Sequence, residues 1–385
     1  MFTSATNVEE LIRNFRVEDA MFRYSSFVPR LYNLCKSLGF EPGKMLPSRA
    51  FCSDENQGYP IIVITKHFGT FPFSHGRGGA VVATDRHGPF AQHGKDLVII
   101  QASHVGYDPE THEFGTYSRI HAEECVRTTS CGKLSAIVSW YQEQYRFAQH
   151  NILVERCDGE VCLSIDNDLL RSTRREGLFL NLTRMVQRDA DGNIIPLHTH
   201  STSKSFAASE ALQCKLADPD LQEGERIPMG SRLTPDLFFF RRELDDAVES
   251  LDHQESSLIN PMPWIVTSPT PLLTAAQINT QIEFDRAFRT VAQAPSFRGK
   301  NVFYISGLNI DISPQPTDIF PTTKFVPWAA YSKGKDGSQR IIEQRELIEL
   351  LHQQTEDNPD QIELDTAIHE MSEARVIRVD THEHG

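Results

Sequence analysis

Two cysteines, a histidine and an aspartate lie at positions in the sequence from which they could bind one metal ion. Cys52 and Asp54 come at the end of a short run of strand type, His104 follows the run DLVIIQA, and Cys131 lies where a helix is predicted to begin. Side chains alternate along a strand, so Cys52 and Asp54 point to the same face. A thiolate and a carboxylate at this separation can share one metal. Two thiolates and an imidazole can bind zinc and leave its fourth position for water.

The same residues also allow two other interpretations. A single cysteine or histidine at a strand end is commonly a small buried side chain, and no Cys-x-x-Cys pair supports the metal site. A helix N-terminus stabilises a thiolate, so Cys131 could be a reactive thiol. With His104 as its base it would resemble a thiol enzyme, although no third orienting group is evident. The residues alone leave all three interpretations open.

Four segments carry a family resemblance, and they occur in the family's order. FCSDE, FGTFPFSHGRGGAVVATDRHGP, VIIQASHVGYD and TTSCGKLSA together resemble the limiting-CO2-inducible protein B family, the theta-class, beta-like carbonic anhydrases. The resemblance spans roughly residues 45 to 140. It implies a fold like that of beta-class carbonic anhydrases, a homodimer, and Zn2+ held by Cys52, His104 and Cys131. It also implies that Asp54 is the carboxylate on the metal side.

One position departs from the beta-class pattern. There the aspartate pairs with an arginine two residues later, whereas this chain has Asn56. An arginine partner for Asp54 must therefore come from elsewhere, with Arg77 the first choice and Arg49 or Arg119 behind it. The implied activity is that of a lyase that interconverts CO2 and bicarbonate by attack of zinc-bound hydroxide on CO2. The alternative is a catalytically silent zinc-binding scaffold of the same family in inorganic-carbon handling.

Apolar periodicity predicts the elements that would hold these residues. The spacing predicts two helices between Val8 and Leu38 and another over 131–148. Short bounded apolar runs predict strands over 49–52, 61–65 and 96–102. Further along, the pattern predicts helices over 238–251, 277–292 and 339–353, and a strand over 301–307. We expect an α/β fold with a beta-carbonic-anhydrase-like sheet flanked by helices, an N-terminal helical arm and an additional C-terminal α+β region. A polar, turn-rich stretch places a boundary near 215, with the zinc domain over 1–215 and a region of unknown role with an acidic tail over 216–385.

Composition excludes several classes of function. The net charge is −14, and residues 343–385 contribute 12 − 3 = 9 of those negative charges. Without a basic patch to offset this charge, nucleic-acid binding is not expected. No apolar run approaches the ~18 residues needed to span a bilayer, and no secretory signal begins the chain, so we expect a cytoplasmic protein. The family resemblance implies that its substrate is a small molecule, CO2 or bicarbonate. Seven scattered cysteines in such a chain do not predict a disulfide framework.

Overall fold

The structure is a computed structural model. It describes residues 5–74, 76–77, 80–81, 96–119, 127–157, 159–216, 221–244, 251–315, 317–318 and 320–373. Contacts group the chain into two units: the first comprises Met1–Asp19, Ser103–Glu283 and Ile310–Pro321, and the second comprises Ala20–Ala102, Phe284–Asn309 and Thr322–Gly385. Each unit contains segments from both sides of residue 215. The domain boundary expected at that position stays a prediction.

A central mixed sheet of eight strands lies mainly in the second unit, while β7 and the last residues of β6 and β17 belong to the first. Its main path runs β1-β18-β17-β6-β2-β3, and β19 and β7 pair with β18 and β6 at its margins. β2 is parallel to both β3 and β6, whereas β1 and β19 are antiparallel to β18. The bounds are β1 Phe22–Arg23, β2 Met45–Ala50, β3 Phe73–Ser74, β6 Asp96–Asp108, β7 Glu113–Phe114, β17 Asn301–Ile312, β18 Thr322–Lys333 and β19 Gln339–Glu343.

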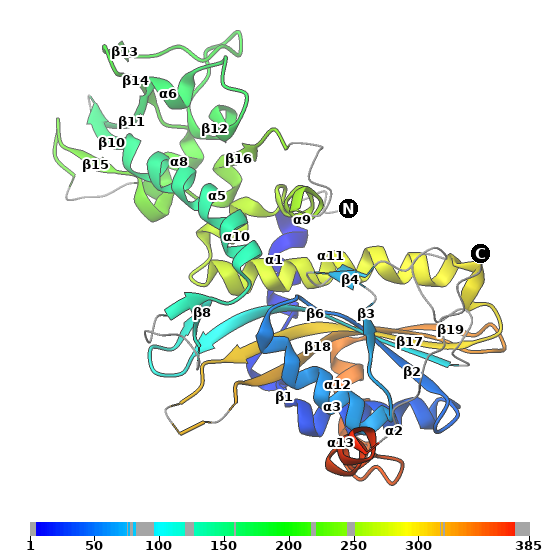
Figure 1. Ribbon diagram of the computed structural model, residues 1–385. Coiled ribbons are helices and arrows are strands. Elements are labelled where there is room, and N and C mark those ends of the chain that lie inside the picture. Colours follow the sequence, from blue (N-terminus) through cyan, green and yellow to red (C-terminus); the bar gives the residue numbers. More distant parts are fainter. Residues whose placement is uncertain are drawn as a thin grey trace, which may run out of the picture. The chain divides into compact units, whose positions relative to one another are not determined.

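Helices cover both faces of this sheet within the second unit (Figure 1). α2 (Tyr24–Ser37), α3 (Gly58–Phe68) and α12 (Gln344–His352) bury an aromatic and aliphatic core against one face. On the other face, the end of α11 (Pro271–Gln293) stacks Phe284 on Tyr304 of β17 at a ring separation of 5.5 Å. The expected α/β class, with a sheet flanked by helices, is confirmed.

The first unit contains a second sheet, which is antiparallel in the order β13-β14-β11-β10-β15. The long helix α5 (Gly132–Asn151) packs against it. Two amides of α11, Gln277 Nε2 and Gln281 Nε2, donate to the carbonyl oxygens of Phe15 and Leu11, each at 3.0 Å. These bonds hold the end of α1 (Ala5–Asn14), the expected N-terminal helical arm.

The remaining elements are short. The strands are β4 Gly76–Arg77, β5 Ala80–Val81, β8 Thr116–Ser118, β9 Arg127–Thr129, β10 Ile152–Cys157, β11 Glu160–Asp166, β12 Gly177–Leu180, β13 His198–Thr199, β14 Ser203–Ala207, β15 Arg226–Pro228 and β16 Phe238–Arg241. The helices are α6 Asn167–Leu170, α7 Leu182–Met185, α8 Glu210–Leu216, α9 Leu251–Leu258, α10 Met262–Thr267 and α13 Leu364–Ser372. The 3-10 helices are η1 Glu18–Ala20, η2 Glu55–Gln57, η3 Gly230–Arg232, η4 Pro235–Leu237 and η5 Pro295–Phe297.

Several element predictions were wrong. The run 61–65 is helical within α3, because tertiary burial of Val63, Ile64 and Phe68 on one side overrides the β preference of its branched residues. The predicted helices 238–251 and 339–353 begin as strands β16 and β19. Phe238 and Phe240 are buried, whereas Phe239 and Arg241 are exposed, which is the period of two of a strand. The sequence does not reveal this period because four bulky residues follow one another.

Two further structural facts bear on the sequence expectations. No helix among the described residues is both long and apolar enough to cross a membrane. None of the six described cysteines forms a disulfide, and Cys125 lies outside the described residues.

Candidate metal centre

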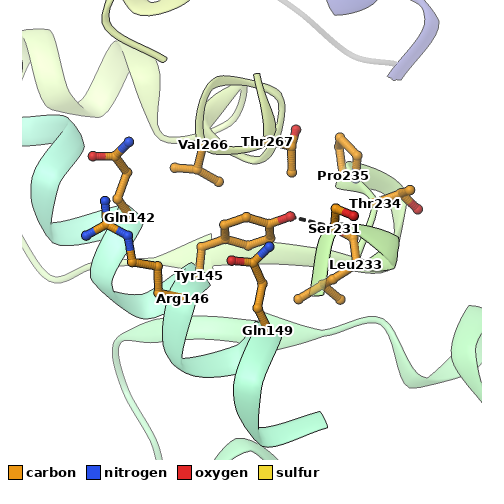
Figure 2. A pocket seen from close by; sticks show the side chains of 10 residues that line it. All are labelled: Gln142, Tyr145, Arg146, Gln149, Ser231, Leu233, Thr234, Pro235, Val266 and Thr267. Atoms are coloured by element: carbon orange, nitrogen blue, oxygen red, sulfur yellow. Dashed lines mark hydrogen bonds between the residues drawn. The ribbon is translucent and has the colours of Figure 1, made fainter. Parts of the chain in front are cut away.

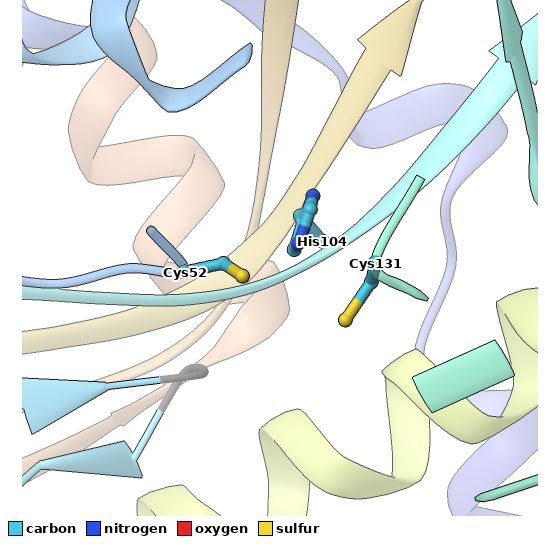
Figure 3. A group of neighbouring side chains, drawn as sticks. All are labelled: Cys52, His104 and Cys131. Carbon is cyan, nitrogen blue, oxygen red and sulfur yellow. The ribbon is translucent and has the colours of Figure 1, made fainter. Parts of the chain in front are cut away.

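Cys52, His104 and Cys131 lie together. Their ligand atoms, two Sγ atoms and a ring nitrogen, are all within 4.8 Å of one another (Figure 3). His104 and Cys131 are buried, and Cys52 is partly buried. Sulfur and imidazole donors favour transition metals over magnesium or calcium. The three residues that the sequence analysis proposed as ligands could therefore hold a metal ion.

Each donor comes from a different kind of backbone site. Cys52 lies two residues after β2, as expected for a strand end. His104 lies within β6, because this strand continues to Asp108 and does not stop at Ala102 as predicted. Cys131 is the N-cap residue of α5 and has a left-handed backbone with φ 59°. A residue other than glycine rarely adopts that conformation, so the surrounding structure must impose it on Cys131.

A buried carboxylate orients the histidine. Asp311 Oδ2 lies 2.7 Å from His104 Nδ1, and both side chains are almost fully inaccessible to solvent. A proton on Nδ1 then points at the carboxylate, and the lone pair of Nε2 is the one available to an ion. Ser130 Oγ donates to the same Asp311 oxygen at 2.8 Å. One carboxylate thus anchors His104 and the residue that precedes Cys131.

Sequence reasoning missed Asp311. The predicted strand stopped at residue 307, but β17 continues to Ile312. Its later part, LNIDI, places Asn309 and Asp311 in otherwise apolar surroundings, and both are completely buried. Buried polar residues at alternate positions of an apolar strand require partners. That alternation is the signal that could have found Asp311.

Gly106 lets the segment that carries Cys131 approach β6. A Cβ atom at Gly106 would lie 2.5 Å from the carbonyl oxygen of Thr116 and 2.8 Å from Cβ of Ser130. The Gly106 carbonyl accepts a hydrogen bond from Gly115 N at 2.8 Å, and the Gly115 carbonyl accepts one from Ser130 N at 3.3 Å. In the run His-Val-Gly, the histidine therefore supplies a donor atom and the glycine supplies the space for the next segment.

The loop that contains Asp54 is fixed from β17 and β18. Asp54 is the N-cap residue of η2 and is partly buried. Asn309 Nδ2 donates to Gln57 Oε1 at 2.6 Å and its own Oδ1 accepts from Tyr24 at 2.7 Å. The carbonyl of Asn56 accepts from Thr323 Oγ1 at 3.2 Å. These buried bonds set the course of the chain directly after Cys52.

The candidate arginines differ in their surroundings. Arg77 belongs to β4, but its side chain lies outside the described residues. Arg119 is engaged elsewhere, since its Nε donates to Thr128 Oγ1 at 3.1 Å and its guanidinium lies over Tyr117. Arg49 on β2 is partly buried, and burial lowers its pKa. Its Nε has no hydrogen-bond partner within the described part of the chain.

A separate hollow of about 470 Å³ opens in the first unit between α5, α10 and residues 231–235. The ring of Tyr145 crosses it, and the hydroxyl donates to the carbonyl of Leu233 at 2.9 Å (Figure 2). Its lining is mixed, with Arg146 beside the apolar side chains of Leu233 and Val266. It shares no residue with the metal-ligand group.

Comparisons with known proteins return structural neighbours only. No protein-family model and no curated protein matches the chain. The chain is similar to the crystal structure of PtLCIB4, a homologue of the limiting CO2-inducible protein LCIB, with a TM-score of 0.49 and 11% identity over 88% of this chain and 99% of the other. A histidine-to-alanine mutant of PtLCIB4 gives a TM-score of 0.48 and 11% identity over 87% and 96% of the two chains. LCIB itself gives 0.43 and 13% over 87% and 97%. These neighbours carry the name of the family that the four sequence segments resemble.

Proposed function

We propose that this chain is a zinc-dependent carbonic anhydrase that interconverts CO2 and bicarbonate. The observation that carries the proposal is the convergence of Cys52, His104 and Cys131. These are the residues to which the four-segment resemblance assigns the metal. The reaction itself is inferred from that resemblance.

The donor set fits zinc. Bonds of about 2.3 Å to sulfur and 2.0 Å to nitrogen place the donors of a tetrahedral site roughly 3.5–3.8 Å apart. Donor atoms already within 4.8 Å of one another need only small side-chain movements to reach that spacing. Zinc bound there would leave one position for water and supply a nucleophile near neutral pH by lowering the pKa of that water.

The chain's own residues have separate tasks in this proposal. Asp311 accepts the Nδ1 proton of His104 and so directs Nε2 toward the ion. The start of α5 stabilises the thiolate of Cys131. Asp54 accepts a hydrogen bond from the attacking water and orients it toward CO2. Arg77 is the proposed cation that keeps the Asp54 carboxylate away from the metal.

The test is CO2 hydration measured by stopped flow beside zinc analysis of the same sample. We expect about one zinc per chain. Cys52→Ser, His104→Ala and Cys131→Ser should each lose most of the zinc and the activity, whereas Cys157→Ser and Cys214→Ser should lose neither. Full zinc in all three ligand variants would exclude the assignment. Full zinc in Cys131→Ser together with lost catalysis would favour a thiol enzyme.

A catalytically silent zinc-binding scaffold is the second candidate. The observation in its favour is Asn56, which is buried with 1% exposure at the position where beta-class enzymes carry the arginine. Protein that is loaded with zinc but does not hydrate CO2 would identify this function. The family resemblance adds a proposed homodimer, and light scattering that gives the 43.6 kDa mass of one chain would contradict it.

A further inference from the structure

Helix α13 (Leu364–Ser372) presents an uncovered apolar stripe. None of its nine residues is buried. Leu364, Ala367, Ile368 and Met371 recur at i, i+3, i+4 and i+7, and Ile368 and Met371 are 56% and 59% exposed. Helices this short are marginal in water without packing against a partner. The stripe has the spacing with which amphipathic helices dock on other surfaces.

Acidic residues flank the stripe. Asp365 follows Leu364, and Glu370 precedes Met371; both are exposed. At 100° per residue these two carboxylates fall on opposite sides of the stripe. A surface that receives α13 must therefore be apolar and must carry cations beside its apolar centre.

One described surface of the same chain has this character. The antiparallel pair β12 (Gly177–Leu180) and β16 (Phe238–Arg241) alternates, so that Phe238 and Phe240 are buried and Phe239 is 40% exposed. Phe179 lies opposite Phe239, and their rings stack with centroids 5.6 Å apart.

Two guanidiniums lie on these rings. Arg241 is 5.0 Å from the ring centroid of Phe179 and 5.2 Å from that of Phe239, and Arg174 is 5.6 Å from that of Phe179. Within the described part of the chain, neither guanidinium forms an ion pair with a carboxylate. Stacking orients a guanidinium and leaves its edge N–H groups able to reach carboxylates. Arg174 already donates through Nη1 to the carbonyl oxygen of Asp168 at 3.3 Å and through Nη2 to Gln144 Oε1 at 3.4 Å, so Arg241 is the principal cation for an incoming carboxylate. We call Arg174, Phe179, Phe239 and Arg241 the Arg–Phe face.

We propose that α13 of one copy docks on the Arg–Phe face of a second copy. Neighbouring side chains of the stripe are about 5–6 Å apart, which matches the 5.6 Å between the two rings. The thioether of Met371 suits an aromatic surface, and Asp365 and Glu370 meet Arg174 and Arg241. Pairing of α13 with α13 would instead bring like charges together, which is unfavourable. The contact is heterologous, joining different surfaces of two copies, and is independent of the metal group.

Charge reversal tests the docking in the full-length protein. Sedimentation velocity over a series of concentrations should show association of the wild type that weakens at high salt. Arg241→Glu and Glu370→Arg should each weaken that association by about tenfold or more. The double variant Arg241→Glu/Glu370→Arg restores opposite charges and should recover most of the association. No concentration-dependent association of the wild type, or a double variant no better than the single ones, would overturn the proposal.

Mixing the two single variants separates docking between copies from docking within one chain. Arg241→Glu protein retains a native α13, and Glu370→Arg protein retains a native Arg–Phe face, so the mixture should associate more strongly than either variant alone. A mixture that associates no more strongly than the single variants refutes docking between copies.

Matched controls reverse charges of the same kind elsewhere. Arg146→Glu changes an exposed arginine of the first unit outside the Arg–Phe face, and Glu373→Arg changes an exposed residue directly after α13. Glu373 falls on the side of the helix away from the stripe. Both controls should associate like the wild type, and a loss equal to that of the test variants would overturn the specific contact. Metal content should be unchanged in every variant, which separates this test from that of the proposed function.

Discussion

His104 Nδ1 and Asp311 Oδ2 lie 2.7 Å apart in a region that solvent does not reach. The two residues are 207 positions apart in sequence, yet this contact decides which ring nitrogen of His104 can bind a metal. Because Ser130 Oγ donates a hydrogen bond to the same oxygen, Asp311 also holds the side chain of the residue before Cys131. Two of the three donors therefore depend on one carboxylate.

Asp311→Asn is expected to lower metal affinity by about 10- to 100-fold. The substitution keeps the size of the side chain but removes the charge that holds the Nδ1 proton of His104. Competition with a chelator of known affinity, followed by metal analysis, measures the change. Asp285→Asn, at an exposed position of α11, is the matched control and should bind metal like the wild type. Unchanged affinity in Asp311→Asn would contradict the orienting role.

Gly106→Ala is expected to destabilise the protein and to weaken metal binding. The new Cβ would meet Thr116 O at 2.5 Å and Ser130 Cβ at 2.8 Å, so the segment before Cys131 must shift. Overpacking of this kind costs about 1–3 kcal/mol in the free energy of unfolding. Denaturant unfolding measures that loss, and metal titration measures the displacement of Cys131. Gly58→Ala is the control, because a Cβ there meets nothing within 4 Å; equal behaviour of the two variants would contradict the close approach.

Local signals were enough to single out the three donors as candidates, but only the four-segment resemblance grouped them at one metal. Short apolar runs predicted parts of β2, β6 and β17, whereas β18 was not predicted and β19 was taken for the start of a helix. α2, α5 and α11 follow from apolar periodicity over three or more turns. The positioning of Cys131 depends instead on Asp311 and Gly106. Their roles arise from contacts with residues distant in sequence, which no short window contains.

The wrong element predictions have a related cause. IIVI in α3 and FFF in β16 are uniformly apolar, so neither run has a period that separates helix from strand. Tertiary packing decides both cases: α3 buries one side under the sheet, whereas β16 alternates between a buried face and an exposed one. Whether a uniformly apolar run becomes helix or strand is decided by the surface against which it packs.

Stability should fall as the pH is lowered from 6.5 to 4, through His67. Burial, with a smaller contribution from Lys66, lowers the pKa of His67 from 6.5 to about 4. Asn358 Nδ2 lies 3.3 Å from His67 Nδ1, a contact in which the neutral ring accepts and the protonated ring cannot. Within this pH window the unfolded chain binds a proton that the folded chain excludes, so the folded state loses roughly 3 kcal/mol from this one group.

Urea unfolding at a series of pH values tests this assignment. The free energy of unfolding of the wild type should fall between pH 6.5 and 4 more steeply than that of His67→Gln, which has no proton to bind there. His150→Gln, at an exposed position, should keep the slope of the wild type. Parallel curves for the wild type and His67→Gln would show that another group is responsible.

Asp54→Ala is expected to retain zinc and to lose at least about a hundredfold in CO2 hydration, because the ligands are intact but the attacking water is no longer oriented. Arg77→Ala should cause a similar loss if Arg77 supplies the cation that position 56 lacks. The double variant should then be little worse than either single one, since both changes break one pair. Arg49 is the competing candidate for the partner of Asp54, so Arg49→Ala is tested in the same series. The partner is the arginine whose substitution reduces activity little further when Asp54 is already replaced. Full activity of Asp54→Ala would remove the aspartate from the mechanism altogether.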